Sequence, residues 1–296
     1  MAKTSKKPRR RWGDRRDAVR VREIDSMHAF MPVILPGRCD NEAFIEEIVD
    51  VEKIQAFVDK KNAANPEYKY TFFHVIAAAI AKTIYLRPKM NRFYAGDRLY
   101  QRNRIVLSFT AKKRFSDNGE EALVFLPCDG ETTIDSLHDM LCEKVSYVRK
   151  DGNQDHTTDM MDIFVKMPRW LLRIVRRVLF FMHYYDITPR ELIREDPYQA
   201  TVFLSNLGSI KLNAAYHHLA EWGTNSIFGV IGRKHKRVVV TEDGTAEIRE
   251  VLKLSMTLDE RIADGYYYSK TIRLLHKILQ NPEILDRPAK EEVDYE

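Results

Sequence analysis

The spacing of apolar and polar residues divides the chain into helices and strands in a mixed order. An alanine-rich stretch that is apolar almost all round predicts a buried helix over Thr71–Arg87, ended by Pro88. Amphipathic spacing predicts further helices over Val51–Lys61, Ile134–Val148 and Tyr266–Leu279. Short apolar or alternating runs predict strands at residues 43–51, 98–101, 104–111, 122–127, 201–206, 226–231, 237–240, 246–251 and 252–258. The order contains no internal repeat, so we expect one α+β domain with a large core.

One further helix, predicted over Pro168–Tyr185, has an unusual composition. Its arginines lie on one side, and its apolar stripe lies on the other. A basic amphipathic helix with aromatic residues can lie on an anionic membrane, but a helix docked on its own core or on a neighbouring subunit has the same pattern. We favour docking, and peripheral membrane contact through Trp170–Tyr185 stays open. The stripe consists of Trp170, Leu171, Ile174, Val175, Val178, Leu179 and Met182.

Composition and charge describe a soluble protein whose excess basic charge is confined to one end. Of the 296 residues, 44% are hydrophobic and 31% are charged. Residues 1–22 hold ten Lys or Arg against two Asp, a net charge of +8, so with +5 overall the remaining residues carry −3. We expect residues 1–20 to be a disordered basic tail and residues 286–296 a solvated acidic tail. The tail offers a membrane contact, whereas we expect no nucleic-acid partner because no nucleic-acid-binding motif accompanies it.

Cysteine and glycine usage excludes several classes of site. Three scattered cysteines, Cys39, Cys128 and Cys142, are too few for a disulfide framework or a zinc motif, which favours a cytoplasmic protein without a metal. No glycine-rich phosphate loop is present, and no apolar run is long enough to span a membrane.

A cluster of charged residues near the end of the chain is the best candidate for chemistry. The strand predicted at 252–258 runs into Asp259-Glu-Arg-Ile-Ala-Asp-Gly265, called here the closing motif, and a helix follows at once. A strand that delivers charged groups onto a glycine turn before a helix can hold reactive side chains rigidly.

Three segments in this order resemble the catalytic domain of the 2-oxoacid dehydrogenase acyltransferases, relatives of chloramphenicol acetyltransferase. The helix at Thr71–Asn91 is similar to an early buried helix of that family, and Ser205-Asn-Leu-Gly208 is similar to its Ser-Asn-Leu-Gly segment. The closing motif stands where the family has Asp-His-Arg-x-x-Asp-Gly. The resemblance covers residues 21–285, with a helical insertion at about 150–200.

The resemblance implies a two-layer α/β sandwich of the chloramphenicol acetyltransferase type, assembled as a homotrimer with active sites between subunits. It implies acyl transfer between coenzyme A and a thiol or hydroxyl acceptor, with no lipoyl group on this chain. Ser205 is then the donor to the oxyanion, and Asp264 is the acid that holds an arginine, for which Arg20 or Arg22 are candidates. The residues expected around the substrate are Asn206, Gly208 and Gly265 of the matching segments, together with His217, which follows the Ser205 turn by a dozen residues.

The base is where the sequence departs from the family, because Glu260 replaces the motif histidine. Histidine has a pKa of about 6.5 and glutamate ordinarily about 4.3, and the difference of about two units costs up to about 100-fold in rate unless burial strengthens the carboxylate as a base. Three hypotheses remain: Glu260 acts as the base, the chemistry has moved to His217 or His218, or catalysis is lost. In the last case the protein is a degenerate trimeric assembly or ligand-binding relative, so whether it is an enzyme stays open.

Overall fold

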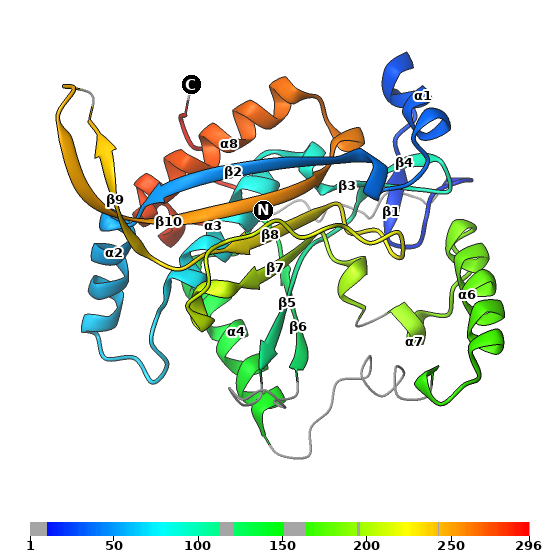
Figure 1. Cartoon of the computed structure of the whole chain (residues 1–296), viewed down its shortest axis with the longest axis horizontal. Helices are drawn as coiled ribbons and strands as arrows, with labels where there is room; N and C mark the ends of the chain where they lie inside the picture. Colours follow the sequence, from blue (N-terminus) through cyan, green and yellow to red (C-terminus); the bar gives the residue numbers. More distant parts are fainter. Residues whose placement is uncertain (1–10, 113–120, 151–163, 194–195, 242, 296) are drawn as a thin grey trace, which may run out of the picture.

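The structure is a computed structural model that describes residues 11–112, 121–150, 164–193, 196–241 and 243–295. It has two layers, a mixed β-sheet and a layer of helices packed against one face of that sheet (Figure 1). The α+β architecture predicted from the sequence is therefore confirmed.

The main sheet has seven strands within the described residues, in the order β2-β10-β8-β7-β5-β6, and β9 pairs with the outer half of β10. The longest strand, β10 (Ala246–Asp259), continues through both segments that we expected to be separate strands. It runs antiparallel to β2 on one side and to β8 on the other, and β7 is parallel to β8. The other strands are β2 (Glu42–Asp50), β5 (Ile105–Lys112), β6 (Glu121–Cys128), β7 (Val202–Asn206), β8 (Ile227–Ile231) and β9 (His235–Val240).

Within the described residues, four helices cover one face of this sheet and enclose the main core. They are α2 (Glu52–Ala63), α3 (Phe72–Leu86), α4 (Ile134–Arg149) and α8 (Gly265–Gln280). As predicted, α3 is buried almost all round, with every residue from Phe73 to Ile84 buried. The opposite face of the sheet, called here the open face, is covered in part by an irregular segment at residues 212–225, the covering segment.

A second, three-stranded sheet corrects the expected N-terminal tail. It has the order β1-β4-β3, formed by β1 (Ala18–Arg20), β3 (Arg92–Ala95) and β4 (Arg98–Arg102). Ala18 is fully buried, and Arg15 lies against the rings of Phe93 and Tyr100. Residues 14–20 are thus part of the fold, because aromatic side chains shield the stem and charge of Arg15. Residues 1–10 of the expected tail lie outside the described residues.

The C-terminal end is packed against the body as well, although its acidic composition predicted a solvated tail. The backbone N–H groups of Ala289 and Lys290 donate to the carbonyls of Thr132 and Gly130. The buried Lys82 Nζ donates to the carbonyl of Pro288 at 2.7 Å. Together with the buried Ala289 side chain, these bonds hold the segment that follows α8 onto the helix layer.

The helix predicted over Pro168–Tyr185 forms as α6 (Arg169–Tyr184) and is only partly docked. Leu171, Val175 and Leu179 are half-buried, whereas Trp170 and Val178 are 64% and 50% exposed. The protein's own residues therefore cover only part of the stripe, and docking of the rest on a neighbouring subunit stays a prediction. A second apolar helix, α1 (Ser26–Ile34), also has exposed side chains, among them Phe30 and Val33. Among the described helices, none has the length and apolar content needed to span a bilayer.

Candidate active site

The closing motif lies where β10 ends and α8 begins, as the sequence predicted. Strand alternation directs Leu258 into the helix-side core and its neighbour Asp259 toward the open face. The chain then makes one 3₁₀ turn over Glu260–Ile262, and the Asp259 side chain caps this turn by accepting from the Arg261 N–H. Asp264 caps α8 in the same way, accepting from the Tyr267 N–H at 2.8 Å.

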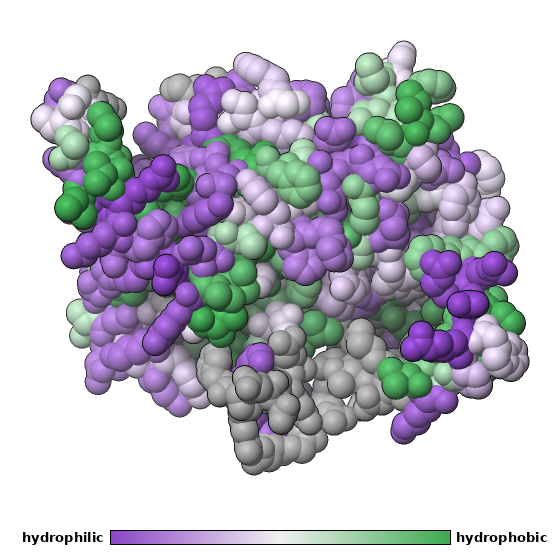
Figure 2. All heavy atoms as spheres, in the orientation of Figure 1, coloured by the Kyte–Doolittle hydropathy of each residue, from purple (hydrophilic) through white to green (hydrophobic). Residues whose placement is uncertain are grey.

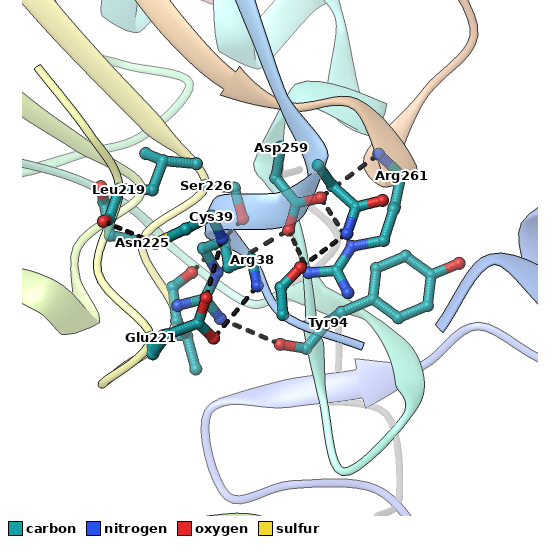
Figure 3. Close-up of polar contacts among 12 residues, drawn as sticks. Arg38, Cys39, Tyr94, Leu219, Glu221, Asn225, Ser226, Asp259 and Arg261 are labelled. Carbon is teal, nitrogen blue, oxygen red and sulfur yellow. Dashed lines mark hydrogen bonds and ion pairs between the residues drawn. The ribbon is translucent and has the colours of Figure 1, made fainter. Parts of the chain in front are cut away.

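Below the turn lies a buried cluster of one carboxylate and two guanidinium groups, shown in Figure 3. Arg261 Nε and Nη2 donate to the two oxygens of Asp259, each at 2.8 Å. Arg38 Nε approaches the same carboxylate at 3.7 Å. The side chains of Asp259, Arg261 and Arg38 are at most 5% exposed, so this cluster is a rigid ionic frame rather than a surface ion pair.

The frame ties three distant parts of the chain together. Arg38 donates to the carbonyls of Tyr94, Ala220 and Gly223, and Arg261 donates to the carbonyl of Pro36. Burial lowers the pKa of Arg38, and the Asp259 carboxylate opposes that shift. Burial also opposes the charge of Arg261, yet its hydrogen bonds to Asp259 leave its pKa raised. Guanidinium groups stay protonated in proteins, so both cations face the Asp259 carboxylate and hold the closing motif in place.

Cys39, which follows Arg38, is not a candidate nucleophile in this arrangement. Burial, followed by the hydrogen bond to Glu221, raises the pKa of the Cys39 thiol to about 11. The thiol donates to the carbonyl of Leu219 at 3.1 Å, and the Cys39 N–H donates to Glu221. The residue is therefore protonated near neutral pH and serves to connect the loop before β2 with the covering segment.

Glu260 stands on the rigid turn with its side chain in solvent. It is exposed, and within the part of the chain that the structure describes it makes no hydrogen bond or ion pair. Asp264 has a different partner from the one expected, because its carboxylate faces Lys89 Nζ at 3.7 Å and neither Arg20 nor Arg22. Its hydrogen bond from the Tyr267 N–H is the main cause of a lowered pKa. Gly265 starts α8 with open space around it, so nothing in one chain requires a glycine there.

Ser205 lies at the opposite end of the strands from Glu260. It pairs with Val230 in β8, and Val230 pairs with Ser255 in β10, four residues before Asp259. Four residues along a strand and two strands across it separate Ser205 from Asp259 by about 16 Å. The half-buried Ser205 side chain accepts and donates no hydrogen bond within the described residues. One subunit alone therefore does not bring these two predicted catalytic residues into contact.

Asn206 and Gly208 have structural roles at the turn that follows β7. The Asn206 side chain accepts from the Ser209 N–H and caps the 3₁₀ turn at Leu207–Ile210. A Cβ atom at Gly208 would come within 2.6 Å of the Gly232 carbonyl, so only glycine allows these two segments to pack so closely.

His217 and His218 belong to the irregular covering segment, and both are exposed. The His217 ring stacks on Phe228 of β8 at 4.1 Å between ring centroids. The Nδ1 atom of His217 pairs with the His218 carbonyl, and that of His218 with the Leu219 carbonyl, each at 2.9 Å. The Leu219 N–H in turn donates to Glu42, the partner of Asp259 across β2 and β10. The histidine pair thus lies on the open face between the Ser205 turn and the closing motif.

Arg38, Tyr94 and Glu221 belong to the site but could not be found from the sequence. They lie on three segments far apart in the chain, and no spacing or motif links them to the closing motif. The only feature of the sequence that marks this region is the Pro36-Gly37 pair before Arg38, which indicates a turn but not a site residue.

Comparison with known proteins agrees with this architecture. Residues 188–285 match the family described as 2-oxoacid dehydrogenases acyltransferase (catalytic domain). The match begins at residue 188, so the last dozen or so residues of the expected insertion lie inside the matched segment. No curated protein has a sequence that matches the chain.

Three solved structures show the same fold at low sequence identity. A probable dihydrolipoamide acetyltransferase from Listeria monocytogenes is 14% identical with a TM-score of 0.56, covering 93% of this chain and 97% of that one. The Azotobacter vinelandii dihydrolipoamide acetyltransferase is 15% identical with a TM-score of 0.57, covering 89% and 93%. A truncated catalytic core of the Thermoplasma acidophilum 2-oxoacid dehydrogenase complex is 16% identical with a TM-score of 0.53, covering 88% and 99%. The predicted resemblance to these acyltransferase cores is confirmed.

Proposed function

We propose that this protein is a coenzyme A-dependent acyltransferase that acts as a homotrimer, with each active site between two subunits. One observation carries the proposal: Glu260 has no partner among the described residues of its own chain, and the buried Asp259–Arg261–Arg38 frame holds its turn rigidly from below. Preorganised reactive groups of this kind are what acyl transfer requires. In the Azotobacter enzyme a serine, a histidine and an asparagine were investigated for roles in the catalytic mechanism.

The proposed reaction uses Glu260 of one subunit and Ser205 of its neighbour. Glu260 removes the proton from the thiol or hydroxyl of the acceptor, and the resulting nucleophile adds to the thioester carbonyl of acyl-coenzyme A. The Ser205 hydroxyl donates a hydrogen bond to the oxyanion that forms. When the intermediate collapses, the C–S bond breaks and the departing thiolate takes up the proton from Glu260. The separation of about 16 Å within one chain supports a site that only two subunits complete.

Exposed apolar surface supports self-association. Large apolar side chains of α1 and α6 are exposed to solvent. Figure 2 shows apolar surface on α1 at one corner of the molecule. The hairpin of β9 and β10 projects from the body and exposes Val238, Val240 and Ile248. Contiguous exposed apolar patches usually mark an interface. We propose that neighbouring subunits cover these residues, and binding of α6 to anionic liposomes would instead indicate membrane contact.

The test combines acyl transfer with the assembly state. Release of coenzyme A from acetyl-coenzyme A in the presence of a dithiol acceptor should fall at least about 100-fold in both Ser205→Ala and Glu260→Gln. Sedimentation velocity should give a trimer for all three proteins. Mixing the two inactive variants should restore activity, because some of the sites then pair an intact Ser205 with an intact Glu260. Mixed trimers without any recovery would contradict a site shared between subunits.

A degenerate assembly is the competing function, and the same measurements distinguish it. The replacement of the motif histidine by Glu260 is the observation that favours it. In that case the wild type is a trimer without measurable turnover, and turnover appears only in Glu260→His. This result would show that the frame is intact and that the wild type has lost catalysis.

A further inference from the structure

A cluster of metal-binding side chains lies at the far end of the helix layer from the closing motif. His74 is in the first turn of α3, and His138 and Cys142 are one turn apart on α4. One ligand atom from each residue lies within 4.8 Å of the other two. The length of α3, about 20 Å, separates this cluster from the closing motif, so the two have independent roles.

The buried His74 side chain has an unpartnered nitrogen that suits a metal ligand. His74 is 5% exposed, and its Nε2 atom has no hydrogen-bond partner. Its Nδ1 atom accepts a hydrogen bond from the Thr71 N–H at 3.1 Å and lies 2.8 Å from Thr71 Oγ1. The neutral ring then carries its proton on the unpartnered Nε2. A metal at Nε2 takes the place of this proton, which moves to Nδ1 and donates to Thr71 Oγ1, and the bond from the Thr71 N–H is lost. A hydrogen bond on the second ring nitrogen is the usual support of a metal-bound histidine.

The other two side chains are already spaced like the ligands of a tetrahedral ion. His138 Nε2 lies 3.5 Å from Cys142 Sγ and 3.0 Å from the Tyr68 carbonyl oxygen. Bonds of about 2.1 Å to nitrogen and 2.3 Å to sulfur give a ligand separation of about 3.5 Å in a tetrahedron. The His138 Nδ1 atom lies 3.2 Å from an oxygen of Asp139, which supplies the carboxylate that often orients a zinc-bound histidine.

We propose that His74, His138 and Cys142 form a zinc site that joins the start of α3 to α4. The zinc ligands are His74 Nε2, His138 Nε2 and Cys142 Sγ, with the Tyr68 carbonyl or a water in fourth position. The most distant ligand atoms move together by about 1 Å on binding, the Cys142 thiol releases its proton, and the His138 contact to Tyr68 is replaced. The Tyr70 ring stacks on His138 at 3.9 Å between centroids and shields the site from water. With the Tyr68 carbonyl as fourth ligand the site is closed and structural, because it joins the segment before α3 to α4.

Cobalt(II) replaces zinc in tetrahedral sites and reports a thiolate ligand through its charge-transfer band, so it is the probe of choice. The full chain, freed of metal with a chelator, should bind one cobalt(II) per chain and show that band. Zinc should displace the cobalt and, at 100 times its Kd, raise the melting temperature by about 5 °C.

Matched cysteine variants identify the ligand. Cys142→Ser should lose the charge-transfer band and weaken zinc binding about 100-fold or more, while Cys39→Ser should retain both. If Cys142→Ser is unstable, His138→Gln provides the same comparison with the thiol intact. Binding of equal strength in wild type, Cys142→Ser and His138→Gln, or cobalt without a thiolate band in the wild type, would refute the site.

Discussion

Replacing Asp259 by asparagine should cost much of the protein's stability, because it leaves two buried cations without their counter-charge. The substitution preserves shape and removes one negative charge. Arg261 donates to both Asp259 oxygens at 2.8 Å, and an amide can accept only one of these bonds. Arg38, 3.7 Å away and buried, loses its ion pair as well. The change therefore acts on the frame and not on solvent-exposed charge.

The expected loss is about 4 kcal/mol. A hydrogen bond to a charged group contributes about 1.5–3 kcal/mol, and removing one partner of a buried ion pair costs about 3–5 kcal/mol. With a slope of about 3 kcal/mol per molar urea, the unfolding midpoint should fall by about 1 M or more. Urea titrations followed by far-UV circular dichroism, at one protein concentration for all variants, measure this shift.

Glu260→Gln is the matched control, since it makes the same chemical change at the next residue. The exposed Glu260 side chain has no partner among the described residues, so the free energy of unfolding of Glu260→Gln should match that of the wild type to within about 0.5 kcal/mol. Asp259→Asn with stability within about 1 kcal/mol of the wild type would show that the frame does not hold the turn. If Glu260→Gln lost as much stability as Asp259→Asn, the loss would not come from the buried frame, which Glu260 does not contact.

Three further predictions concern the fold. Gly223 has a φ of +83°, and a Cβ there would lie 2.3 Å from the Tyr198 carbonyl, whereas Gly244 has the same φ with open space around it. Gly223→Ala should therefore lower the melting temperature much more than Gly244→Ala, whose cost is about 1–2 kcal/mol, and equal shifts would contradict the close approach. Burial, followed by the charge of Arg15, lowers the pKa of His183 to about 4, below its value of about 6.5 in the unfolded chain. Between pH 4 and pH 6.5 His183 is protonated in the unfolded chain but not in the folded one. The stability from this residue is therefore full above pH 6.5 and falls by up to about 3 kcal/mol as the pH is lowered toward 4. In urea titrations between about pH 4 and pH 6.5, the free energy of unfolding of His183→Gln should change less with pH than that of the wild type. An unchanged slope would count against a lowered pKa of His183. Deletion of residues 288–296 removes five hydrogen bonds between the described residues and the body, one of them from the exposed Lys290 side chain to Glu131. It should cost about 3–5 kcal/mol by calorimetry, whereas deletion of a free tail would cost nothing.

Much of the local structure could be predicted because it depends on residues close together in the chain. The buried helix over Phe72–Leu86 follows from its apolar composition. The short strands β1 and β3 were missed, since three or four residues are too few for a periodic pattern. The acidic end of the chain suggested a solvated tail, because composition does not reveal carbonyl and amide partners elsewhere.

The sequence by itself determined the order of elements, the family resemblance and the position of Glu260 at the end of a strand before a helix. Only the tertiary structure decided what surrounds that position. The register of β7, β8 and β10 separates Ser205 from Glu260, and the folding of three distant loops brings Arg38 to Asp259. The physical reason is that periodicity and capping act over a few residues, whereas buried charges are compensated by whichever groups the packed chain brings within reach.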